Sequence, residues 1–73
     1  MRLLNINDLN AEIARCNLSI PKLAKLIDVD KKTLYSRMNG ETAFKQTEIQ
    51  KIAKILNLNQ EKILSIFFAD VVS

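Results

Sequence analysis

Apolar residues recur every three or four positions through most of this chain, with polar residues between them. That spacing places the apolar residues of each segment on one face of a helix, and the chain has no long alternating run of the kind that strands show. The pattern predicts five helices, at about 7–16, 20–28, 31–39, 46–56 and 60–68. We therefore expect an all-α domain.

Residue types at the predicted helix ends support these boundaries. Four of the helices are preceded by a side chain that can accept a hydrogen bond from the first turn: Asn7 or Asp8, Ser19, Asp30 and Asn59. Pro21 falls in a first turn, where its missing N–H costs little. Gly40 follows the third helix and is suited to the left-handed backbone of a helix end, and Asn57 ends the fourth helix. Residues 42–45 are expected to form a loop anchored by Phe44.

Residues 19–40, SIPKLAKLIDVDKKTLYSRMNG, have the pattern of two short helices joined by a tight turn. Apolar residues of the two segments can meet across that turn: Leu23, Ala24, Ile27, Leu34 and Met38. Val29 is the one apolar residue inside the turn and is expected to close its base. This arrangement is that of a helix-turn-helix, which presents the beginning of its second helix, here 31–33, to the major groove of DNA.

Composition limits the other possibilities. The 73 residues are expected to form a single domain over 1–73, and 48% hydrophobic residues are enough for a dense core. Because the chain has no histidine and one cysteine, we expect no metal site, no cofactor and no internal disulfide. Cys16 lies at the end of the apolar stripe of the first helix, which favours a buried structural thiol over a reactive one. No glycine-rich loop or group of convergent carboxylates indicates an enzyme.

The sequence also lacks signs of export or membrane insertion. The first residues, MRLLNINDLN, do not form the unbroken apolar stretch of a signal peptide, and no segment approaches the length of a membrane span. A lone cysteine fits a reducing compartment. We therefore expect a soluble, cytoplasmic protein with no small-molecule ligand.

Positive charge is concentrated on the helix-turn-helix and the segment after it. The whole chain has a net charge of +3, whereas the span from Lys22 to Lys54 holds eight basic and four acidic residues, a net charge of +4. The remaining residues have three basic and four acidic side chains, a net charge of −1. A basic face of this kind suits neutralisation of DNA phosphates, although an ordinary solvated lysine-rich surface has the same composition.

The chain resembles the Cro/repressor-type helix-turn-helix family of phage and bacterial transcription regulators at positions in and around the turn: Leu23-Ala24, Val29, Thr33-Leu34 and Asn39-Gly40. The resemblance covers roughly Leu9 to Phe68, and the last two helices also resemble those of small phage regulators. It implies a compact five-helix, lambda-repressor-like domain. It also implies a sequence-specific regulator of transcription that binds double-stranded operator DNA.

The resemblance further implies which residues meet DNA. The positions that face base edges in the family correspond here to Lys31, Lys32, Thr33 and Ser36. Lysine donates to guanine O6 and N7, and Thr or Ser bonds a base or touches a thymine methyl. Phosphate contacts are expected from the start of the second helix, the end of the third helix and the following loop: Ser19, Lys22 with its backbone N–H, Asn39, Thr42 and Lys45. Arg37 is expected to be a further phosphate contact or a surface residue.

Three positions depart from the family pattern. Ile20-Pro21 stand where a glutamine often opens the second helix and holds a phosphate. Lys31 replaces a glutamine that often reads adenine, which favours guanine in the operator. Asp28 takes a left-handed position where glycine is common, and aspartate tolerates that backbone less well.

Some alternatives stay open at this point. Lys31 and Lys32 can be a solvated helix start, although positive charge there opposes the helix macrodipole. Tyr35 either packs against the fourth helix or reaches the DNA backbone. The fold can also serve protein–protein interaction, as in an antirepressor or antitoxin, because its C-terminal apolar residues are too many for one buried face: Ile63, Leu64, Ile66, Phe67, Phe68, Val71 and Val72.

The same surplus of apolar residues predicts a symmetric homodimer on DNA, formed through the last helix and the tail. One recognition helix reads too few base pairs to select a site, and a two-fold dimer doubles the number read. Phe67 and Phe68 are adjacent, so one is expected beneath the first helix and the other, with Ile66, Val71 or Val72, against the partner. The alternative is a tail that folds back over its own core.

Overall fold

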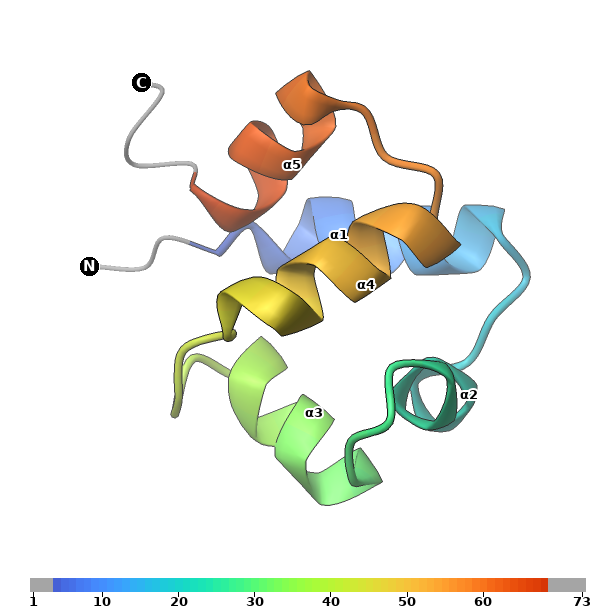
Figure 1. The fold of residues 1–73 in the computed structure, drawn as a ribbon, viewed down its shortest axis with the longest axis vertical. Coiled ribbons are helices and arrows are strands. Elements are labelled where there is room, and N and C mark those ends of the chain that lie inside the picture. The colour runs from blue at the N-terminus through green and yellow to red at the C-terminus, as the bar shows by residue number, and fades with distance from the viewer. Residues whose placement is uncertain (1–3, 69–73) are drawn as a thin grey trace.

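Five helices and their connections make up the part of the protein that the structure, a computed structural model, describes, residues 4–68 (Figure 1). In chain order they are α1 (Ile6–Arg15), α2 (Ile20–Leu26), α3 (Lys31–Met38), α4 (Gln46–Ile55) and α5 (Gln60–Phe67). Within residues 4–68 there is no strand, so the predicted all-α fold is confirmed. None of the helices in that range is both long and apolar enough to cross a membrane.

The helix starts follow the predicted caps at two of the four positions. Ser19 Oγ accepts a hydrogen bond from the backbone N–H of Lys22 at 3.2 Å, and Asn59 Oδ1 accepts one from Lys62 at 2.8 Å. Pro21 lies in the first turn of α2, as expected. Asp30 occupies the position before α3, but its side chain makes no capping hydrogen bond.

The prediction that α1 starts at Asn7 or Asp8 was wrong, because Asn5 is the capping residue. Asn5 Oδ1 accepts from the backbone N–H of Asp8 at 3.2 Å, and Asn5 Nδ2 donates to the Asp8 carboxylate at 3.1 Å. The backbone N–H of Asn5 also donates to the carbonyl oxygen of Ile66 at 2.6 Å. This bond to α5 helps to place the start of α1. It joins residues far apart in the chain, so the local sequence pattern could not predict it.

The helix ends share one design. After α1, α2, α3 and α4 the chain turns through a residue with positive φ: Asn17, Asp28, Gly40 and Asn57. At each end two backbone N–H groups return to carbonyl oxygens of the last turn, the paired bonds of the Schellman motif. The next residue is apolar after three of these helices, Leu18, Val29 and Leu58, and packs on the core. After α3 that residue is Glu41, which is exposed.

The core draws apolar side chains from all five helices. Seven large side chains are almost completely buried: Leu9, Leu23, Ile27, Leu34, Ile52, Leu56 and Ile66. In Figure 1, α4 crosses the middle of the domain in front of α1, with α5 above them and α2 and α3 below, and α5 packs against both α1 and α4. The helix-turn-helix therefore rests on a scaffold made by the other three helices, and α3 is held along one side only.

The packing of α5 corrects one of the predictions made for its apolar residues. Phe67 is buried, as expected for one of the two adjacent rings, and its ring meets that of Phe44 edge to face at 5.3 Å. Ile66, which was expected to face a partner, has no exposed surface and belongs to the core. Phe68 is half-buried. Val71 and Val72, the other predicted contacts, lie outside the described residues.

Candidate nucleic-acid interface

The turn between α2 and α3 sets the direction of α3. Asp28 has a φ of +61°, which confirms that it takes the left-handed position where glycine is common. The backbone N–H of Val29 donates to the carbonyl oxygen of Ala24 at 3.0 Å, and half-buried Val29 packs against the core. Lys51 of α4 adds a hydrogen bond from its Nζ to the carbonyl oxygen of Ile27 at 3.5 Å. Bonds from α2 and α4 thus hold the turn.

The two sides of α3 have different environments. Leu34 and Met38 are buried in the core, as the sequence predicted. Lys31 and Lys32, in the first turn, are exposed, and neither forms an ion pair with any residue between 4 and 68. Thr33 is half-buried beside them. The beginning of α3 therefore presents two cations to solvent at a helix end that itself favours negative charge.

Tyr35 lies on the same exposed side, and 41% of its surface is accessible. It follows Lys31 by four residues and Lys32 by three, the spacings that bring side chains together on a helix surface. An aromatic ring this exposed is not part of the core. At 3.6 residues per turn Tyr35 lies on the flank of α3, next to the buried side of Leu34 and Met38, so the helical spacing alone did not decide its exposure.

Ser36 has a partner that the sequence analysis missed. Its hydroxyl donates to Oε1 of Glu41 at 3.3 Å, from the last turn of α3 to the residue after Gly40. With its proton engaged, the Ser36 oxygen still has a free lone pair and can accept a hydrogen bond from a base amino group. Glu41 therefore places a negative charge next to one of the four residues expected to read bases.

At the start of α2 the structure corrects one expected donor. The backbone N–H of Lys22 was expected to meet a phosphate, but it donates to Ser19 Oγ. Two groups remain for a phosphate at this place, the hydroxyl proton of Ser19 and the ammonium group of Lys22, and both residues are exposed. The candidate contact therefore uses side chains rather than the backbone of α2.

Arg37 makes a buried ion pair that the sequence analysis did not foresee. Its Nε donates to Oε1 of Glu48 at 2.7 Å and its Nη2 to Oε2 at 3.2 Å, a two-pronged contact from α3 to α4. Its Nη1 donates to the hydroxyl oxygen of Thr42 at 2.8 Å. The Arg37 and Glu48 side chains are only 14% and 9% exposed. Arg37 therefore points into the protein, and we remove it from the residues expected to touch phosphate.

Glu48 also holds the backbone at the start of α4. Its Oε1 accepts from the backbone N–H of Lys45 at 3.0 Å, half of the capping-box arrangement. Burial alone would raise the pKa of Glu48, but hydrogen bonds from Arg37 and Lys45 and the charges of the same two residues outweigh it and lower the pKa. The carboxylate therefore stays ionised through the neutral range, and the pair stays intact.

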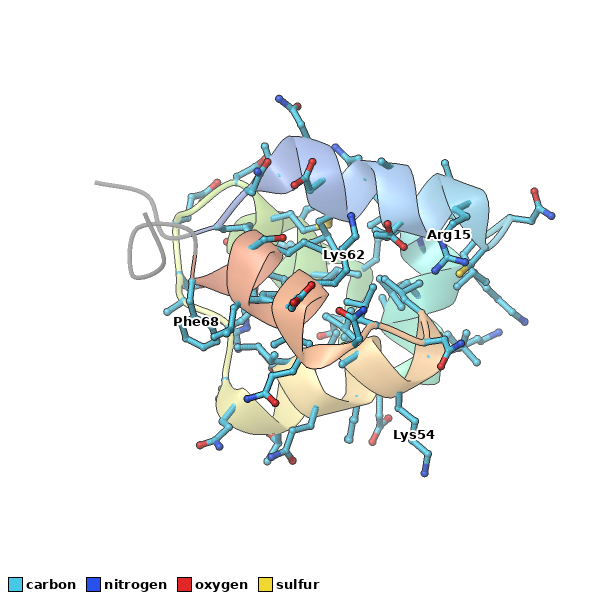
Figure 2. The ribbon with its side chains drawn as sticks, turned by 90° about the horizontal axis from the view of Figure 1, so that it is seen from above. Arg15, Lys54, Lys62 and Phe68 are labelled. Atoms are coloured by element: carbon cyan, nitrogen blue, oxygen red, sulfur yellow. The ribbon has the colours of Figure 1, made fainter. Side chains whose placement is uncertain are left out.

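Two cations on the α1–α5 side of the molecule share one carboxylate partner. Arg15 of α1 and Lys62 of α5 both approach Glu12, at 2.7 and 3.8 Å. Arg15 Nη2 also donates to the carbonyl oxygen of Leu56 at 2.7 Å. Figure 2 shows Lys62 between α5 and α1, and Lys54 pointing away from α4 into solvent.

A second surface feature is an apolar depression beside the end of α5. Two adjoining hollows of about 290 and 360 Å³ share three half-buried side chains, Phe44, Ile49 and Phe68. The loop 40–43 borders one hollow, and Ile63 borders the other. The lining comes mostly from the loop, α4 and α5, and Arg37 is the one residue of α3 that borders it.

Comparison with known proteins agrees with this geometry. The helix-turn-helix family matches residues 11–59, most of the chain and all of the segment from α2 to α4. The chain belongs to the Cro/C1-type helix-turn-helix family, a family of DNA-binding regulators that are typically not enzymes. No curated protein and no solved structure matches the chain significantly.

Proposed function

We propose that the protein is a sequence-specific, Cro- or repressor-like transcription regulator that binds double-stranded DNA with residues 31–39 in the major groove. The observation that supports this proposal most is the exposure of two lysines in the first turn of α3. Lys31 and Lys32 are exposed and without a carboxylate partner among the described residues, whereas the opposite side of α3 is fixed in the core. A rigid helix with free cations at its beginning fits the phosphate-rich groove of a duplex.

Each candidate side chain has a distinct part in this proposal. Lys31 and Lys32 donate to guanine, Thr33 touches or bonds a neighbouring base, and Ser36 accepts from a base amino group. Phosphates are met by residues on both sides of the recognition helix: Ser19, Lys22, Asn39, Thr42 and Lys45. With no cofactor or small-molecule ligand in the proposal, occupancy is set by the concentration of the protein in the cytoplasm and by competing proteins.

A homodimer completes the proposed complex. One α3 reads only a few base pairs, so two copies related by a two-fold axis, with half-sites roughly 34–36 Å apart, are needed for selectivity. The apolar depression around Phe44, Ile49 and Phe68 supports a contact through the C-terminal part of the chain. Ile66 has no part in this contact, because it is fully buried.

The same depression favours a second candidate function, recognition of another protein, as in an antirepressor or antitoxin. Apolar surface of this kind is typical of protein contacts. Under this alternative, the affinity for DNA is absent or barely depends on salt, because no phosphates are neutralised. The dependence on salt therefore separates the two functions.

The test is selection of bound fragments from a random pool of duplex DNA, followed by titration of the selected site. The proposal predicts one enriched sequence with two related halves and a binding constant that falls steeply with salt. Light scattering of the saturated complex is expected to give two protomers for each site. Failure to enrich any sequence would refute sequence-specific binding, and a single protomer on a site without two-fold character would refute the dimer.

A further inference from the structure

The ion pair between Arg37 and Glu48 connects the recognition helix to the loop expected to hold phosphate. Arg37 is in the last turn of α3, Glu48 is in the first turn of α4, and the loop 41–45 runs between them. One guanidinium donates to both the Glu48 carboxylate and Thr42, and the same carboxylate accepts from the backbone of Lys45. Four hydrogen bonds thus link the two helices and both proposed phosphate residues of the loop.

The pair also controls the direction of the Thr42 hydroxyl group. Because the Thr42 oxygen accepts a hydrogen bond from Arg37 Nη1 at 2.8 Å, its own proton points elsewhere. Thr42 is exposed, so that proton is available to an anion outside the protein. An arginine at this place therefore turns a freely rotating hydroxyl into an oriented donor.

Burial makes the arrangement rigid. Glu48 is the one charged residue of the described chain that is buried, and both of its oxygens accept hydrogen bonds. A guanidinium held by two parallel bonds to a carboxylate has a fixed plane, unlike the flexible ammonium group of a lysine. The position of the loop relative to α3 is consequently set before any ligand arrives.

We propose that Arg37 and Glu48 are positioning residues for DNA recognition. They fix the α3–α4 loop so that Thr42 and Lys45 meet a phosphate while Lys31 and Lys32 lie in the groove. The inference rests on the proposed function and adds residues to it that do not touch DNA themselves. Because the loop is already held in place, less conformational entropy is lost when these contacts form on binding.

A double-mutant cycle between Arg37→Met and Thr42→Val tests the pairing. Affinity is measured on the selected operator, at a temperature where circular dichroism shows each variant to be folded. In the wild type, Thr42→Val is expected to weaken binding by about tenfold, the loss of one hydrogen bond to a charged group. In the Arg37→Met background the same change is expected to have almost no effect, because Thr42 is no longer oriented.

The salt dependence gives a second measurement that a purely structural role would leave unchanged. Loss of the Lys45 contact in Arg37→Met is expected to reduce the slope of log K against log salt by about 0.9, the value for one phosphate. Arg15→Met is the matched control. Arg15 of α1 likewise bonds a residue at another helix, the carbonyl oxygen of Leu56 at the end of α4, but it lies away from the loop (Figure 2). It is expected to keep the wild-type slope.

The possible outcomes separate the two proposals. Additive losses and an unchanged slope would overturn the positioning role while leaving DNA binding intact. A wild-type protein that binds no DNA would overturn the proposed function and this inference together. Where Arg37→Met does not fold, Arg37→Lys replaces it in the cycle, because lysine keeps the charge but cannot bond Glu48 and Thr42 in the same way.

Discussion

The α3 side and the α1–α5 side of this molecule both carry basic side chains, but within the described part of the chain those compared here have a carboxylate partner on the α1–α5 side only. On the α1–α5 side, Arg15 and Lys62 share the carboxylate of Glu12. On the α3 side, Lys31 and Lys32 have no carboxylate within ion-pair distance among residues 4–68. Cations that are already paired gain little from an external anion, whereas free cations at the beginning of a helix gain more. The difference indicates which side is suited to a polyanion.

Neighbouring residues of α3 also differ, in how far they are exposed to solvent. Leu34 is 1% exposed, and Tyr35, the next residue, is 41% exposed. Leu34→Ala is expected to lower the free energy of unfolding by about 2–5 kcal/mol, because it leaves a cavity in the core. Tyr35→Ala is the matched control and is expected to change stability far less. Thermal melting of both variants checks this, and equal losses would show that α3 is rotated from the orientation described.

Removing the charge of Glu48 is expected to have the next largest effect. Glu48→Gln keeps the shape of the side chain but weakens its bonds to Arg37, so unfolding is expected to become easier by about 1–3 kcal/mol at pH 7. The pKa of Glu48 is lower in the folded protein. Its contribution is therefore fully present above the pKa of the unfolded chain, about 4.3, and is lost as the pH falls through the folded pKa.

Chemical denaturation between pH 7 and pH 3 checks this dependence. The wild type is expected to lose more stability over this range than Glu48→Gln, so the two curves approach each other in acid. Curves that stay parallel would show that the ion pair does not stabilise the fold. Glu12→Gln is the control from the α1–α5 side, where the pair is more exposed, and it is expected to have a smaller effect than Glu48→Gln at pH 7.

The helices were predictable from the sequence, whereas several details of the site were not. Periodicity and caps are local, so the five helices and the left-handed Gly40 follow from short segments, whereas the left-handed Asp28 followed from the family resemblance. Arg37 and Glu48 are eleven residues apart and meet only when α3 packs beside α4. Nothing local distinguishes an arginine that faces DNA from one that faces a buried carboxylate.

The C-terminal helix shows a different limit of the sequence. Apolar residues occupy so many positions of α5 that its buried side cannot be found from their spacing alone. The contact between Asn5 and Ile66 and the packing of α5 against α1 decide that Ile66 points inward. Among the described residues, Phe68 and its neighbours in the depression then remain for the proposed contact with a second copy.

Replacement of single lysines is expected to have the most selective effect. If Lys31 reads a base, Lys31→Ala weakens binding of the selected operator by about 1–3 kcal/mol and relaxes the preference at one base pair. If Lys31 contacts a phosphate instead, Lys31→Ala is expected to weaken binding to all DNA sequences about equally. Repeated selection with the variant distinguishes these results. Lys32→Ala is tested in the same way, and the two lysines are expected to affect different positions.

The most direct measurement for the central claim is the affinity of Lys31→Ala/Lys32→Ala for the selected operator at several salt concentrations, compared with Lys62→Ala. The α3 variant is expected to bind far more weakly than the wild type while melting at nearly the same temperature, because both lysines are exposed. Lys62→Ala, whose ammonium group already faces Glu12, is expected to bind as the wild type does. Wild-type affinity in the α3 variant, or an equal loss in Lys62→Ala, would contradict the claim that the beginning of α3 is the DNA-binding surface.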